Sequence, residues 1–76
     1  MRERIKQVMR DVFGLSDIAD DISQKTCGKW DSMHHLQLAV GLETEFDVSL
    51  EPEEIGEMIS LNDIEKIITA IISRGN

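Results

Sequence analysis

The residues best suited to chemistry lie in one short stretch, in which Asp31 and Ser32 are followed by His34 and His35. A serine nucleophile needs a base and an oxyanion site, and His35 could share a helix face with Ser32. However, no Gly-x-Ser-x-Gly turn surrounds Ser32, and a chain of 76 residues leaves little room for a catalytic pocket. The adjacent histidines would diverge on a helix, and no second pair of ligands is spaced to join them at a metal. We therefore predict no catalytic residue and no metal site, and we interpret both histidines as exposed polar surface.

This stretch also has the pattern of a helix start. Apolar residues follow it at helical spacing. They form a stripe of Met33, Leu36 and Val40, which is widened by Leu38, Leu42 and Phe46. Asp31 suits the N-cap, since its carboxylate can accept hydrogen bonds from unpaired amide groups of the first turn. Ser32 then takes the first helical position, where the partial positive charge of a helix start favours a phosphate. On the residues alone, a purely structural cap is the favoured interpretation.

Asp31-Ser32-Met33, followed by Leu36 and by Leu42-Glu43-x-Glu45-Phe46-Asp47, resembles the acyl carrier proteins, and the resemblance covers nearly the whole chain. It implies that a phosphopantetheinyl transferase attaches 4′-phosphopantetheine from coenzyme A to the Ser32 hydroxyl. Asp31 would hold the helix start and help to position that transferase. The chain would then be no enzyme, and would carry acyl groups as thioesters on the flexible arm and deliver them to partner enzymes.

The stretch departs from carriers of fatty-acid synthesis. Met33 replaces their common Leu, and His34 and Gln37 stand where they often have acids. Trp30-Asp31-Ser32 with a following His is more similar to stand-alone carriers that serve specialised ligases and pathway gene clusters. The expected partners are an acyl- or aminoacyl-adenylating ligase and acyl-transfer enzymes with basic docking patches. An aminoacyl, D-alanyl or peptidyl carrier of the same fold, and an acidic helical adaptor that is never modified, are alternatives.

The spacing of apolar and capping residues predicts the elements that must position Ser32. We expect helices over residues 2–13 and 32–46, a connection over 15–31, and a short helix from Pro52 through Met58. A last helix is capped by Ser60 and ends at Gly75 and Asn76. No strand pattern or repeat is present. The prediction is one all-α domain over 1–76, a monomeric four-helix bundle with three long helices and one short one.

Charge limits the partners. The chain has 8 basic and 15 acidic side chains, a net charge of −7, and no Lys or Arg between Trp30 and Glu65. Nucleic acid and anionic membranes are therefore poor partners. The acidic window could be a solvated surface, but we favour a docking face for basic patches. The predicted docking residues are Met33, Glu43, Glu45, Glu53, Glu54 and Glu57.

The remaining predictions concern location and the acyl chain. Cys27 is the only cysteine, Arg2 to Arg10 is too charged for a signal peptide, and no apolar run could span a bilayer, which together indicate a cytoplasmic protein. The resemblance implies an acyl-chain cavity between the second, third and fourth helices, although plain core is the simpler interpretation of its residues. The predicted lining residues are Leu36, Leu42, Leu50, Ile55, Met58, Ile64 and Ile67.

Overall fold

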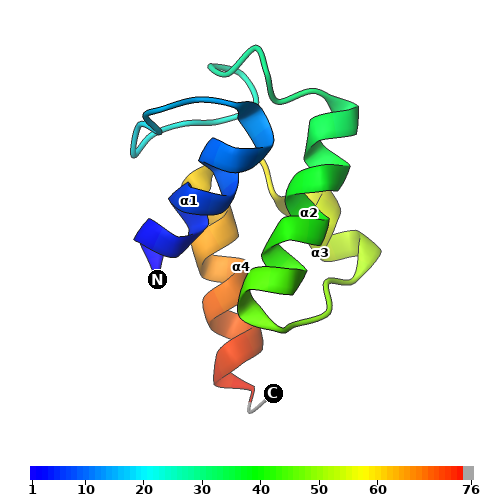
Figure 1. Cartoon of the computed structure of the whole chain (residues 1–76). Coiled ribbons are helices and arrows are strands. Elements are labelled where there is room, and N and C mark those ends of the chain that lie inside the picture. The colour runs from blue at the N-terminus through cyan, green and yellow to red at the C-terminus, as the bar shows by residue number, and fades with distance from the viewer. Residues whose placement is uncertain (75–76) are drawn as a thin grey trace.

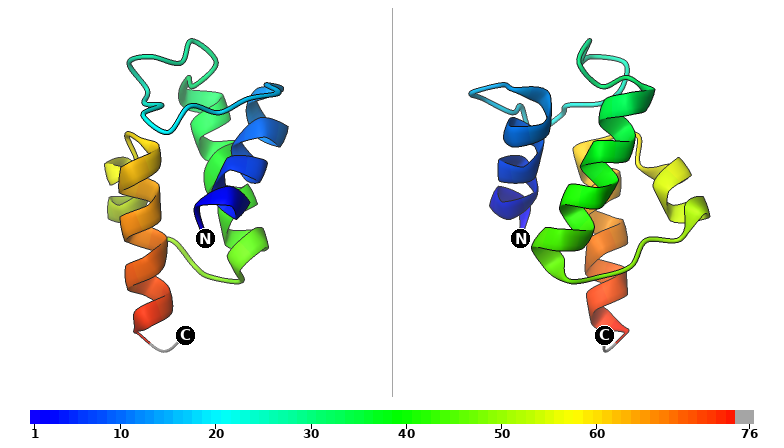
Figure 2. Two further views of the ribbon diagram at one scale, coloured as in Figure 1. Left: turned by 90° about the vertical axis from the view of Figure 1, so that its left-hand side faces the viewer. Right: turned by 45° about the vertical axis from the view of Figure 1, so that its right-hand side comes forward.

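The computed structural model describes residues 1–74, and Figure 1 shows the arrangement of its helices. They are α1 (Arg2–Phe13), α2 (Ser32–Phe46), α3 (Pro52–Glu57) and α4 (Leu61–Ser73), and no β-strand occurs within residues 1–74. The predicted all-α class is therefore confirmed, with three longer helices and one short helix. Helix α1 packs against both α2 and α4, whereas α3 stands to the side of the three longer helices (Figure 2). The predicted end of the last helix at Gly75 and Asn76 lies outside the described residues.

Helix α1 forms one side of the core. Ile5, Val8, Met9 and Phe13 are buried, because their spacing places them on a single helix face. Val12 is only partly buried and packs against the core cluster. The helix ends as predicted at Gly14, whose φ of 67° is a left-handed conformation that glycine adopts without strain.

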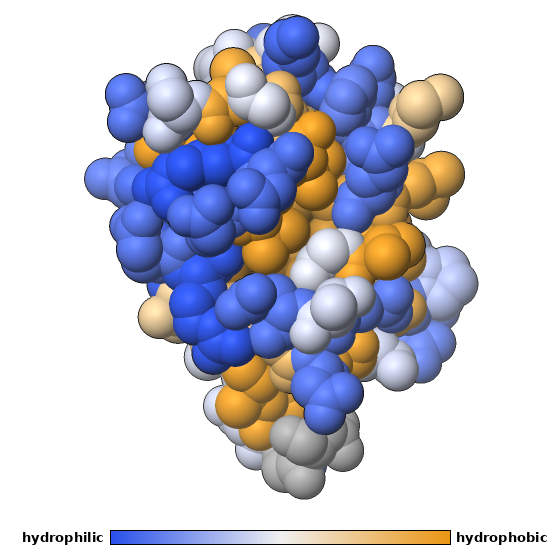
Figure 3. Space-filling model, viewed as in Figure 1, coloured by the Kyte–Doolittle hydropathy of each residue, from blue (hydrophilic) through white to orange (hydrophobic). Residues whose placement is uncertain are grey.

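Helix α2 has the predicted bounds, but only one side of the predicted apolar stripe is buried. The side chains of Met33, Leu36 and Val40 are 67%, 61% and 61% exposed, whereas Leu38 and Leu42 are fully buried. The two sets of apolar residues lie on different sides of the helix, and both recur at helical spacing. Periodicity alone therefore could not decide which set faces inward. Figure 3 shows apolar side chains at the surface on the side where α2 runs, beside the largely hydrophilic α1.

Gly41 lets α1 and α2 approach closely. A Cβ atom added at Gly41 would lie 2.8 Å from the Cγ1 atom of Val8 on α1, closer than real Cβ contacts allow. Helix α2, which carries Ser32 at its first residue, is thus held directly against α1.

The connection between α1 and α2 crosses the end of the molecule at which α2 begins (Figure 1). It is tied down by four buried side chains along its length, whereas Ala19 is exposed and Leu15 is only partly buried. Its backbone also bonds to the segment before α4, since Gln24 N–H donates to the carbonyl of Ile59 at 2.9 Å. The buried side chains of the connection are Ile18, Ile22, Cys27 and Trp30.

Helices α3 and α4 follow the predicted capping signals. Pro52 begins α3, which ends at Glu57, so Met58, predicted within it, is instead its C-cap and is fully buried. No residue of α3 itself is buried. The Ser60 hydroxyl accepts a hydrogen bond from the Asp63 amide and caps α4. None of the helices in residues 1–74 is long and apolar enough to cross a membrane.

Candidate functional site

The candidate site is the start of α2. Asp31 has an extended backbone (φ −95°, ψ −176°), and its Oδ1 atom accepts a hydrogen bond of 2.9 Å from the amide of His34. Ser32 is the first helical residue, and it is exposed. The predicted placement of both residues is therefore confirmed. An exposed hydroxyl at this position lies beside amide groups of the first turn, where a phosphate is electrostatically favoured.

The Asp31 carboxylate is held as an anion. Its pKa lies below the ordinary value, chiefly because it accepts the hydrogen bond from the His34 amide. A contact of 2.7 Å between the same oxygen and Nδ1 of His34 lowers the pKa further. The His34 ring is half-buried against the cap, and it is not the fully exposed group that the sequence suggested. Asp31 and His34 thus brace the turn that presents Ser32.

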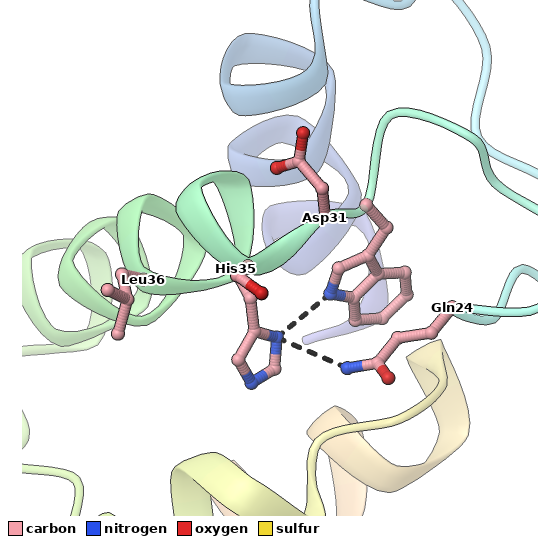
Figure 4. A pocket seen from close by; sticks show the side chains of 6 residues that line it. Gln24, Asp31, His35 and Leu36 are labelled. Atoms are coloured by element: carbon pink, nitrogen blue, oxygen red, sulfur yellow. Dashed lines mark hydrogen bonds between the residues drawn. The ribbon is translucent and has the colours of Figure 1, made fainter.

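An open hollow of about 490 Å³ lies beside Ser32. Figure 4 shows Gln24 and His35 facing one another in this hollow, with Asp31 pointing away from them and Leu36 further along the helix. Polar and apolar groups thus meet next to the hydroxyl. The hollow is lined by Gln24, Trp30, Asp31, Ser32, His35 and Leu36.

His35 corrects the prediction most clearly, because it is not exposed polar surface. Its ring is half-buried and bonded on both sides: Nδ1 lies 2.9 Å from the indole Nε1 of Trp30, and Nε2 lies 2.7 Å from the carbonyl oxygen of Ile55. Neither ring nitrogen is therefore free to take a proton from Ser32. A signal was present in the sequence, since His35 lies three and seven residues before the buried Leu38 and Leu42, on the same helix face.

The residues predicted to line an acyl-chain cavity fall into two groups. Leu42, Leu50, Met58 and Ile64 are buried in one core cluster, and two further predicted lining residues, Ile55 and Ile67, pack against it half-buried. Leu36 is separate from them, because it lies exposed in the hollow beside Ser32. The sequence argument that all of these side chains must be buried is thus wrong for Leu36.

Several predicted docking residues have partners inside the protein. Glu43 accepts a 2.8 Å hydrogen bond from the amide of Leu50, and Glu45 forms a 2.9 Å ion pair with Arg4. Glu54 accepts from the amide of Glu51, completing a capping box, and its other oxygen lies 3.4 Å from Arg74. These three carboxylates therefore stabilise the fold and are only partly available to a partner.

The other predicted docking residues are open to solvent. Glu53 and Glu57 are exposed, and no ion pair involves either of them within residues 1–74. Met33 is exposed next to Ser32. Sequence reasoning missed the continuation of this exposed apolar surface to Leu36 and Val40. It also missed that Gln24 contributes to the hollow.

In comparisons with known proteins, no protein-family model and no curated protein matches the chain.

Proposed function

We propose that the protein is a stand-alone carrier that holds acyl groups as thioesters on a 4′-phosphopantetheine arm attached to Ser32. The observation that supports this most is the exposed Ser32 hydroxyl at the first residue of α2, next to the Asp31 cap. A phosphodiester formed there would sit where the helix dipole stabilises negative charge. The arm would be supplied by coenzyme A through a phosphopantetheinyl transferase, and the carrier itself would perform no chemistry.

The arrangement of the helices supports the proposal in a second way. A carrier of this kind is a small four-helix bundle in which the modified serine begins the second helix, and we propose that architecture here. The long connection is anchored by buried side chains such as Trp30, which directly precedes the cap. The serine is thus presented by a braced turn rather than by a loose loop. The hollow beside Ser32 gives the phosphopantetheine arm an open, partly polar surface on which to lie.

The exposed face around Ser32 suits a protein partner. Met33, Leu36 and Val40 form an apolar strip along α2, and Glu53 and Glu57 supply acidic groups on α3. Such a face would fit a partner with an apolar groove edged by basic residues. We propose that the partners are an adenylating ligase and acyl-transfer enzymes in the cytoplasm.

The test is covalent loading. The purified chain should be incubated with coenzyme A and a phosphopantetheinyl transferase of broad specificity, and its intact mass measured. We expect a gain of one phosphopantetheine that Ser32→Ala abolishes and that Ser49→Ala, a matched control at another exposed serine, leaves in place. No gain, under conditions in which a known carrier is fully loaded, would instead indicate an unmodified acidic adaptor.

A second step separates the kinds of cargo. The loaded chain can be offered to acyl-adenylating and to aminoacyl-adenylating ligases with their acids and ATP. Formation of an acyl thioester supports the proposed acyl carrier, whereas exclusive aminoacyl loading would show an aminoacyl or D-alanyl carrier.

A further inference from the structure

His35 connects three parts of the molecule. It belongs to the first turn of α2, it contacts Trp30 at the end of the long connection, and it contacts the backbone of Ile55 in α3. Figure 4 shows its bonds to Trp30 and toward Gln24. Since α3 has no buried residue, its position depends on such tethers.

The partners of the ring dictate where its proton sits. The indole of Trp30 can only donate, so Nδ1 of His35 must accept, and the carbonyl of Ile55 can only accept, so Nε2 must donate. The side-chain amide of Gln24, 3.4 Å from Nδ1, also donates from its nitrogen and agrees with this assignment. Only the neutral tautomer with the proton on Nε2 satisfies all of these contacts. A proton added at Nδ1 would place two donors face to face.

The charged groups that neighbour these residues in the chain have other partners: Asp31 follows Trp30, and Glu54 precedes Ile55. On α2, Asp31 is bonded to His34 and not to His35. On α3, Glu54 is bonded to the Glu51 amide and lies close to Arg74. The groups that contact the imidazole from the connection and from α3 are uncharged: Gln24, Trp30 and the carbonyl of Ile55.

We propose that His35, as the neutral tautomer protonated on Nε2, is a positioning residue for Ser32. It fixes the indole of Trp30, and with it the backbone that leads into the cap, and it ties α3 to the wall of the hollow beside the hydroxyl. This role rests on the proposed function only where it concerns modification of Ser32. The clasp itself, meaning the paired bonds of His35 to Trp30 and Ile55, exists in the unmodified chain.

The clasp can be tested first without any modification. Trp30 is the only tryptophan, so its indole N–H gives a single signal in proton–nitrogen correlation spectra. Long-range correlations of the His35 ring in the unmodified chain should show a proton on Nε2 and a bare Nδ1. On acidification that protonates the ring, the Trp30 signal should shift together with the His35 nitrogens. A proton on Nδ1 at neutral pH, or a Trp30 signal that does not follow His35, would overturn the proposal.

Two variants divide the clasp into its halves. In His35→Asn the side-chain oxygen can take the place of Nδ1 and still accept from Trp30, whereas His35→Gln can place a donor at Nε2 and reach Ile55. Of the two contacts, the one with Trp30 lies nearer to Ser32, because Trp30 directly precedes the cap residue Asp31. We therefore expect His35→Gln and Trp30→Phe to lower kcat/KM for loading of Ser32 by about two- to tenfold, the range of one neutral hydrogen bond. His35→Asn should stay close to the wild type, and folding of each variant is checked by circular dichroism.

The pH dependence supplies a readout that a merely structural role would not move. The ratio of loading rates of wild type to His35→Asn cancels the transferase's own response to pH, because Asn cannot titrate. We expect this ratio to fall as the imidazole becomes protonated, and a constant ratio would overturn the positioning role. If the chain is never loaded but the tautomer and the coupled Trp30 shift are observed, the proposed function fails while the clasp stands. If loading is normal but the tautomer is wrong, the clasp fails alone.

Discussion

The close packing of α1 on α2 determines whether Gly41→Ala stabilises or destabilises the protein. Gly41→Ala adds a methyl group 2.8 Å from Cγ1 of Val8, a buried side chain in the core. In an open helix this change would stabilise by about 1 kcal/mol, because Gly is the poorer helix former. Forcing a methyl group into a packed core costs about 1–3 kcal/mol. We therefore expect a net loss of about 0–2 kcal/mol, and a fall of about 4–8 °C in the thermal midpoint for each kcal/mol lost.

The matched control is Gly56→Ala, since an added Cβ at Gly56 in α3 meets no atom within 4 Å. This variant should be neutral or more stable than the wild type in urea unfolding, by up to about 1 kcal/mol. In a Val8→Ala background, where the clashing methyl group is absent, Gly41→Ala should change sign and become stabilising. If Gly41→Ala stabilised the wild-type chain as much as Gly56→Ala does, the close contact that positions α2 would be wrong.

Three further predictions test the site. Leu36→Ala should change the free energy of unfolding by at most about 0.5 kcal/mol, whereas Leu42→Ala should cost about 2–5 kcal/mol in urea unfolding; equal costs would contradict the assignment of the faces of α2. The pKa of Asp31 is lower in the folded protein than in the unfolded chain, where it is about 4. The ionised cap therefore stabilises the folded protein fully at pH values above that unfolded pKa. This stabilisation is lost as the pH falls through the lower pKa of the folded state. Asp31→Asn should therefore show a shallower fall of the thermal midpoint in acid than the wild type, and parallel curves would refute this contribution. Glu53→Lys with Glu57→Lys should slow loading by a ligase partner several-fold at low salt but little at high salt, because exposed charges are screened, and slowing that is independent of salt would contradict a charged docking face.

Local signals in the sequence were sufficient to predict the helices and the placement of Ser32. Asp31, Pro52 and Ser60 mark helix starts, and Gly14 marks an end, because capping depends on the chemistry of neighbouring residues. The start and the end of each helix are determined by residues within one helical turn of it. They could therefore be predicted without knowledge of what packs against each helix.

The orientation of α2 and the contacts of His35 could not be predicted in this way. Helix α2 is apolar on more than one side, and its orientation depends on the contact of Gly41 with Val8 of α1, a helix that lies far from α2 in the sequence. The bonds of His35 to Trp30 and Ile55 join segments up to 20 residues apart. Glu43 likewise looked like a surface charge, but it accepts a hydrogen bond from the Leu50 amide, which becomes visible only once the chain has turned back.

The central claim concerns one hydroxyl group, and the position of the attached group tests it most directly. The chain has no Lys or Arg between Trp30 and Glu65, so trypsin releases one peptide, from Trp30 to Lys66, that contains Ser32, Ser49 and Ser60. After loading with coenzyme A and a transferase, fragmentation of this peptide by tandem mass spectrometry locates the added mass. The account predicts one phosphopantetheine, on Ser32 alone. An unmodified peptide, or the group on Ser49 or Ser60, would contradict it.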